Sequence, residues 1–287
     1  MSSESHVLSS QAQAIAELLE QLINDAAIEV PMLPEVANKA LLLAQNPDSD
    51  ATEMAKLIQS DQSLAGHVMR IANSVAYTPL ANLVSLQQAI ARLGMGLISE
   101  IALAASIGTK LFNTPGYEDY VEQLWRHALA SGLWAKEIAR HSRTNVEVAF
   151  LAGLLHSMGR PAVLQSILDL AKQQAVTLSP EDITALESNY CHSVTTSVIN
   201  AWKMPSLVVE AVSYYADYKK APNALTQAAQ VHAGALYATH MLHEDELDKT
   251  GLLSSPVLSI LNLYQDEAEQ LLTHTDAVKN RLEGLSS

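Results

Sequence analysis

The stretch FLAGLLHSMGR, residues Phe150–Arg160, is an apolar run that ends in a histidine and then meets a glycine. Such a run, closed by Gly159 and Pro161, predicts a buried helix from Val146 to His156. A histidine at the end of an apolar helix is also typical of a metallohydrolase site, but such sites place a carboxylate directly after it. Here the next residue is Ser157. The stretch therefore indicates either a catalytic site with an unusual ligand or the remains of one in a protein with another role.

Helical periodicity extends from this stretch through almost the whole chain. A long helix is expected from about Tyr120 to His141, and Ser179 and Pro180 together are typical of the first turn of another. Asp50 and Ser85 are further candidate N-caps. Aromatic residues make up only 5% of the chain, and no segment alternates with the period of a strand. The predicted fold class is all-α.

Composition and charge limit the classes of function. The net charge is −14 without a cluster of Lys or Arg, which argues against binding nucleic acid through its phosphates but leaves room for a small nucleotide in a locally basic pocket. Cys191 is the lone cysteine, so there is no intrachain disulfide and a reducing compartment is expected. The first residues lack the pattern of a signal peptide, and no apolar run approaches the roughly 20 residues of a membrane span. We expect a cytoplasmic protein that binds neither nucleic acid nor membrane.

Three of the ten histidines stand out because each lies in apolar company on a predicted helix: His127, His156 and His192. A buried imidazole without a hydrogen-bond partner costs about 1–3 kcal/mol, so each needs one. Side chains on different helices of a bundle can converge into a metal site, although spacing alone does not show that these do.

The order of several motifs resembles the HDOD domain family, the non-catalytic relatives of the HD-domain phosphohydrolases. Similar segments include MLPEVANKALLLAQNPDSD with the following DQSLAGHVMRIANS, then SLQQAIARLGMG, LWRHALASGLWA, AFLAGLLHSMGR and CHSVTTSVINAWKMP. The resemblance covers roughly residues 28 to 218. It implies an HD-domain-like multi-helix bundle, with residues 1–27 as an N-terminal helical extension and residues 219–287 as C-terminal helices packed on the same globule.

In catalytic HD hydrolases, a histidine, a His-Asp pair and a distant aspartate bind divalent metal ions. By resemblance, His127 and His156 match the first two histidines, and Ser157 replaces the paired aspartate. The distant aspartate falls nearest to Gly234, and His192 occupies another family histidine position. The His-His pair of two-metal relatives is replaced by Tyr214 and Tyr215.

These replacements predict a degenerate metal site. A hydroxyl is neutral at pH 7, so Ser157 cannot supply the anionic oxygen that Mg²⁺, Mn²⁺ or Fe²⁺ sites use. No metal, cofactor or catalytic residue is therefore assigned, although imidazoles alone could hold Zn²⁺ or Ni²⁺ weakly. Arg126 and Arg160, with Tyr214 and Tyr215, could give the old cavity a rim for an anionic ligand; the alternative is that both arginines are solvated helix-end residues.

The resemblance implies a non-enzymatic bacterial signal-transduction or regulatory module. Such a module would act by binding a protein partner or a small ligand such as a nucleotide, and its terminal helices could also support a homo-oligomer. The alternative is a metal-dependent phosphohydrolase or phosphodiesterase with an atypical His-only site. The replacement of the paired aspartate by Ser157 and the missing distant aspartate distinguish the two hypotheses.

Overall fold

The computed structural model describes residues 7–25, 27–28, 30–78, 83–107 and 111–286. Within these ranges the chain is helical and contains no strand, which confirms the predicted all-α class. The helices are α1 (Ser10–Asn24), α2 (Glu35–Gln45), α3 (Ala51–Gln59), α4 (Gln62–Ala72), α5 (Leu86–Leu93), α6 (Met95–Ile107), α7 (Glu118–His141), α8 (Val146–Leu155), α9 (Gly159–Gln173), α10 (Pro180–Ala201), α11 (Ser206–Tyr214), the 3₁₀ helix η2 (Tyr215–Lys220), α12 (Leu225–Leu242), α13 (Lys249–Leu253), α14 (Pro256–Ile260), α15 (Gln265–Leu272) and α16 (Thr275–Ser286).

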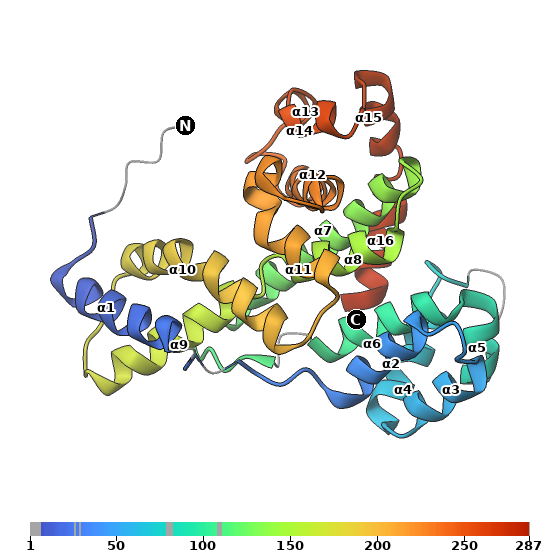
Figure 1. Ribbon diagram of the computed structural model, residues 1–287, viewed down its shortest axis with the longest axis horizontal. Coiled ribbons are helices and arrows are strands. Elements are labelled where there is room, and N and C mark those ends of the chain that lie inside the picture. Colours follow the sequence, from blue (N-terminus) through green and yellow to red (C-terminus); the bar gives the residue numbers. More distant parts are fainter. Residues whose placement is uncertain (1–6, 26, 29, 79–82, 108–110, 287) are drawn as a thin grey trace.

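The helices gather around a central group made of α7, α8, α11 and α12 (Figure 1). Helices α2 to α6 lie at one end of the molecule, and α9 and α10 lie at the other. Helix α1 packs on α9 and α10, while α13 and α14 pack on α12. Helix α16 returns to contact both α7 and α6. In the described part of the chain, the first helix and the last helices are thus packed against the helices between them.

Capping residues fix several helix starts. Asp50 caps α3, and Ser85 caps α5 by accepting a hydrogen bond from a backbone N–H of the first turn. Ser179 caps α10 in the same way, with Pro180 as its first residue. The Asp182 carboxylate of this turn accepts hydrogen bonds from the Ser9 backbone N–H at 3.1 Å and from its hydroxyl at 2.7 Å. This contact joins the start of α1 to the start of α10.

Gly94 separates α5 from α6 with a φ of 85°, a conformation that residues with a side chain rarely adopt. The two helices therefore meet at an angle of 117°. No single described helix is long and apolar enough to cross a membrane; α5 and α6 pass that test only as a bent pair.

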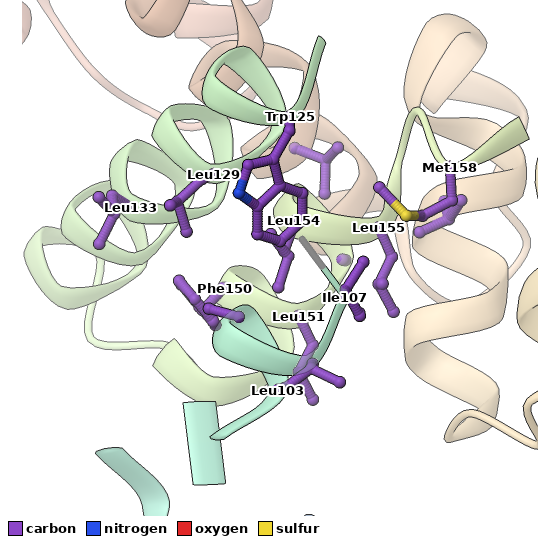
Figure 2. Close-up of a cluster of buried hydrophobic side chains, with 14 of the residues drawn as sticks. Leu103, Ile107, Trp125, Leu129, Leu133, Phe150, Leu151, Leu154, Leu155 and Met158 are labelled. Carbon is purple, nitrogen blue, oxygen red and sulfur yellow. The ribbon is translucent and has the colours of Figure 1, made fainter. Parts of the chain in front are cut away.

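The core is centred on α8, in which every residue from Ala149 to Leu155 is buried. A helix that is apolar on all sides must be covered on all sides, and α6, α7, α11 and α12 contact it. Figure 2 shows how this is done with large aliphatic and aromatic side chains. The labelled residues are Leu103 and Ile107 from α6, Trp125, Leu129 and Leu133 from α7, Phe150, Leu151, Leu154 and Leu155 from α8, and Met158 beyond it.

Glycines let three helix backbones cross at van der Waals distance. A Cβ atom on Gly153 of α8 would lie 2.7 Å from the Cα atom of Gly132 on α7. A Cβ atom on Gly234 of α12 would lie 2.6 Å from the Ser131 carbonyl oxygen, also on α7. Because both crossings lie near the middle of α7, the neighbouring turns of α7, α8 and α12 face one another.

Candidate functional site

A cavity of about 450 Å³ lies where α7, the junction of α8 and α9, η2 and α12 meet. It is the space that the helix crossings leave on one side of α7. Its described lining residues are Tyr120, Gln123, Leu124 and His127 from α7, His156, Ser157 and Arg160 from the α8–α9 junction, Tyr215 from η2, Ala235 and Thr239 from α12, and His243 and Glu246 after α12.

His127 is held by α12. The Thr239 hydroxyl donates to the Ala235 carbonyl at 3.0 Å, so its oxygen is the acceptor for His127 Nε2–H, also at 3.0 Å. Burial lowers the pKa of His127 to about 4, helped by the positive charges that His243 and Arg160 can carry. The imidazole is therefore neutral at pH 7, and its Nε2 atom carries a proton.

His156 is the C-cap residue of α8, and only 5% of its surface is exposed. Its Nδ1–H donates to the Gly153 carbonyl at 2.6 Å, which fixes the tautomer. Burial lowers the pKa of His156 to about 3, with a smaller effect from His127. The ring centroids of His156 and His127 are 6.0 Å apart, and Tyr215 meets His156 edge-on at 4.9 Å.

Arg160, in the first turn of α9, connects the cavity wall to a buried acid. Its Nη1 atom lies 3.8 Å from Oε1 of Glu187 on α10, whose side chain is 2% exposed. The Tyr120 hydroxyl donates to Oε2 of the same carboxylate at 2.5 Å. Burial raises the pKa of Glu187, and the Tyr120 hydrogen bond and Arg160 oppose that rise. The positive charge of Arg160 is thus directed partly at Glu187 and only partly at the cavity.

The described residues do not fit a divalent metal ion. No group of three or more His, Cys, Asp or Glu side chains lies close enough to hold one anywhere in the described ranges. Ser157 faces the cavity as a neutral hydroxyl, and the carboxylate among the described lining residues, that of Glu246, is on an exposed residue. His127 Nε2 is already protonated and bonded to Thr239. Metal-activated water therefore has no described ligand set here.

The structure brings together His127, His156, Ser157, Arg160 and Tyr215 of the residues singled out in the sequence. Gly234 is not among the described lining residues. Its α-carbon faces the α7 backbone, so any side chain there would collide with Ser131 and Ala135. The next residue, Ala235, faces the cavity together with Thr239 one turn later, and Gly234 serves the helix crossing instead.

His192, Arg126 and Tyr214 also lie outside the described lining of the cavity. His192 is exposed on α10, and its carbonyl accepts a hydrogen bond from the Thr196 hydroxyl. Arg126 and Tyr214 are half-buried. The predicted anion rim therefore reduces to Arg160 and Tyr215.

Sequence reasoning missed the four polar residues Tyr120, Glu187, Thr239 and His243. Thr239 and His243 follow Ala235 at intervals of four residues, so a helical spacing on α12 could have placed them on the face of Ala235. Tyr120 and Glu187 are 67 residues apart and meet only through the packing of α7 and α10. No local pattern marks that pair.

Comparison with known proteins identifies the family and the fold of the chain. The model of the HDOD domain matches residues 30–218. An uncharacterized protein of Treponema pallidum (strain Nichols) is 22% identical over 208 residues, which are 70% of this chain and 40% of that protein. The chain thus spans well under half the length of this relative.

Three solved structures share the fold at 20–22% identity. One is a candidate metal-dependent phosphohydrolase from Shewanella amazonensis SB2B, with a TM-score of 0.73 over 97% of this chain and 99% of that one. An HDOD domain protein of unknown function from Geobacter sulfurreducens gives 0.70 over 94% and 96%. A candidate signal transduction protein from Marinobacter aquaeolei VT8 gives 0.69 over 99% and 68%. These similarities confirm the predicted HD-domain-like fold and, with the match over residues 30–218, show that the chain belongs to the HDOD domain family.

Proposed function

We propose that this chain is a non-enzymatic bacterial regulatory module that retains the HD-type cavity without its metal chemistry. The observation that supports this proposal is that, among the described residues, no buried carboxylate lies beside the two cavity histidines. Each donates a hydrogen bond to a protein oxygen, His127 to Thr239 and His156 to Gly153. With Ser157 and Ala235 beside them, neither imidazole has an anionic partner that would help to hold a metal ion.

The cavity also lacks a group that is suited to general acid–base catalysis without a metal. A general base works best with a pKa near the working pH, whereas the pKa values of His127 and His156 lie near 4 and 3. Glu187 is buried behind Arg160 and Tyr120, and it is not among the described residues that line the cavity. The cavity is therefore better suited to binding than to hydrolysis.

The names of the related structures include both an enzyme and a signalling protein. The residues of the cavity must therefore distinguish between the two functions. The Shewanella protein is named as a candidate phosphohydrolase and the Marinobacter protein as a candidate signal transduction protein, on the same fold. The alternative for this chain is a phosphohydrolase with a His-only site. If Nε2 of His127 is the ligand, this alternative requires that His127 give up its hydrogen bond to Thr239.

The test compares the wild type with the double variant Ser157→Asp and Ala235→Asp. This variant places carboxylates at two positions that line the cavity beside the histidines, and elemental analysis and phosphodiesterase assays with Mn²⁺, Fe²⁺ and Ni²⁺ are run on both proteins. We expect no stoichiometric metal and no turnover in the wild type, and metal uptake only in the variant. Wild-type metal or turnover that disappears in His127→Ala and His156→Ala would overturn the proposal.

The mode of regulation is tested separately, by calorimetry with cyclic dinucleotides and guanosine polyphosphates. Heat of binding without hydrolysis would show a nucleotide sensor, and Arg160→Met should then weaken it. Flat traces would direct the search to a protein partner, which a pull-down from the native host would identify. Hydrolysis of any of these nucleotides would contradict the non-enzymatic proposal.

A further inference from the structure

A second cavity, of about 210 Å³, lies away from the His127 cavity, between α6, α7, α8 and α16. Figure 1 shows α16 returning past α7 toward α6 at this place. The inner wall is apolar and includes Leu97, Leu133 and Phe150. The described residues that line this cavity and those that line the His127 cavity are different.

One of the two oxygens of a buried carboxylate in this cavity has no hydrogen-bond partner among the described residues. The side chain of Glu100 on α6 is 5% exposed, and its Oε2 atom accepts a hydrogen bond from Lys136 Nζ of α7 at 2.5 Å. Its Oε1 atom is buried and has no hydrogen-bond partner among the described residues. Burial raises the pKa of Glu100, which Lys136 partly opposes. A buried oxygen without a partner is costly, so a ligand that donates a hydrogen bond to it would be favoured.

Two arginines are fixed at the more exposed end of the cavity. Glu137 Oε1 accepts hydrogen bonds from Nη1 of Arg140 on α7 and from Nη1 of Arg281 on α16, the latter at 2.5 Å. The side chains of Arg140 and Arg281 are 50% and 31% exposed, against 5% for Glu100. Each guanidinium has five N–H donors, and one shared carboxylate uses only a few of them. The pair can therefore receive an anionic group on the side that faces the cavity.

The charged side chains around the second cavity differ in how deeply they are buried. Lys136, Arg140 and Arg281 face the carboxylates of Glu100 and Glu137, and Glu147 of α8 adds a further negative charge near Glu100. The carboxylate of Glu100 lies toward the interior, whereas Glu147 is exposed and the two arginines lie toward solvent. A ligand that matches this order has a donor deep in the cavity and a carboxylate at its mouth.

We propose that this cavity binds a small carboxylate that also carries a hydroxyl or amino group and has an aliphatic body of amino-acid size. The carboxylate meets Arg140 and Arg281, the hydroxyl or amino group donates to Glu100 Oε1, and the aliphatic body packs against Leu97 and Leu133. Because α16 belongs to the C-terminal helices and α6 to the N-terminal ones, the ligand would connect the two ends of the chain across α7.

The experiment is calorimetry and thermal unfolding of the full chain with four compounds that share an isobutyl group. Leucine and 2-hydroxy-4-methylpentanoate carry both groups, 4-methylpentanoate lacks the donor, and 3-methylbutylamine lacks the carboxylate. We expect binding and a rise in Tm with at least one of the first two, binding weaker by about tenfold for 4-methylpentanoate, and none for the amine.

Two variants and one control make the result specific. Arg281→Gln should weaken binding by about tenfold or more, since it removes one of the two cationic partners of the carboxylate. Leu97→Trp should abolish binding by filling the cavity while all charges stay, and it keeps the test valid if Arg281→Gln does not fold. Lys249→Gln removes an exposed ion pair with Glu269 and should change nothing. No binding of any compound at millimolar concentration, or binding that both cavity variants leave unchanged, would overturn the proposal.

Discussion

Replacing Gly234 by alanine should destabilise the protein, although alanine is the better helix former. In an open helical position the change from glycine to alanine stabilises by about 0.5–1 kcal/mol. At Gly234 the added Cβ atom would lie 2.6 Å from the Ser131 carbonyl oxygen and 2.8 Å from the Ala135 nitrogen, both backbone atoms of α7. Inserting a methyl group into a packed interface costs about 1–3 kcal/mol, and backbone contacts this short put the cost at or above the upper end.

The expected net effect is a loss of about 2 kcal/mol, which corresponds to a fall in Tm of about 4–8 °C for a chain of this size. Urea and thermal unfolding measure it. Gly66→Ala is the matched control, because Gly66 is exposed in α4 and its added Cβ atom meets nothing within 4 Å. That variant should gain about 0.5–1 kcal/mol. If Gly234→Ala is as stable as Gly66→Ala, the close crossing of α12 and α7 is refuted, and with it the reassignment of the cavity position to residue 235.

Three further predictions concern the wall of the first cavity. Thr239→Val removes the acceptor of His127 Nε2–H and should cost about 1–2 kcal/mol in urea unfolding, whereas a neutral result would show that this hydrogen bond is not formed. The pKa values of His127 and His156 are lowered on folding, so the unfolded chain binds more protons and stability should fall as the pH drops from about 6.5 toward 4, with a slope of up to about 1.4 kcal/mol per pH unit for each group. Replacing both histidines by glutamine should flatten that dependence, and an unchanged slope would contradict the assignment. Arg160→Met should cost about 1–2 kcal/mol at pH 7 because it leaves Glu187 buried without a cation, a value reduced for the 37% exposure of Arg160, and adding Glu187→Gln should restore most of the loss unless the pair is unimportant.

The helices were predictable because their signals are local. Asp50, Ser85 and Ser179 cap helices as expected, because the backbone N–H groups of a first helical turn have no acceptor within the helix and a side-chain oxygen at the N-cap provides one. The helix from Val146 ends at Leu155, one residue before the predicted end, and the predicted long helix begins at Glu118, two residues earlier than expected. Differences of this size are ordinary because the last turn of a helix frays.

The cavity residues were predictable only where they belong to a distinctive sequence motif. His127, His156 and Ser157 lie in distinctive segments, and all three line the cavity. The distant position on α12 has small apolar residues on both sides, and only the spacing of Thr239 and His243 indicates how the helix is rotated. A shift of one residue turns a side chain by about 100°, which is the difference between Gly234 at the crossing and Ala235 at the cavity.

The two hydrogen bonds of the cavity histidines explain how both imidazole rings are held in place without a metal ion. Two imidazoles at the centre of a helix bundle need either metal or protein partners, because a buried nitrogen without a partner is unfavourable. Thr239 provides an oxygen for His127 from the next turn of α12 after Ala235, and His156 uses the carbonyl of its own helix end. The position of both rings then follows from the helix crossings at Gly132, Gly153 and Gly234 and requires nothing bound in the cavity. A carboxylate introduced at residue 235 would have to compete with Thr239 for His127, so metal affinity in such a variant should rise further when Thr239 is also replaced by alanine.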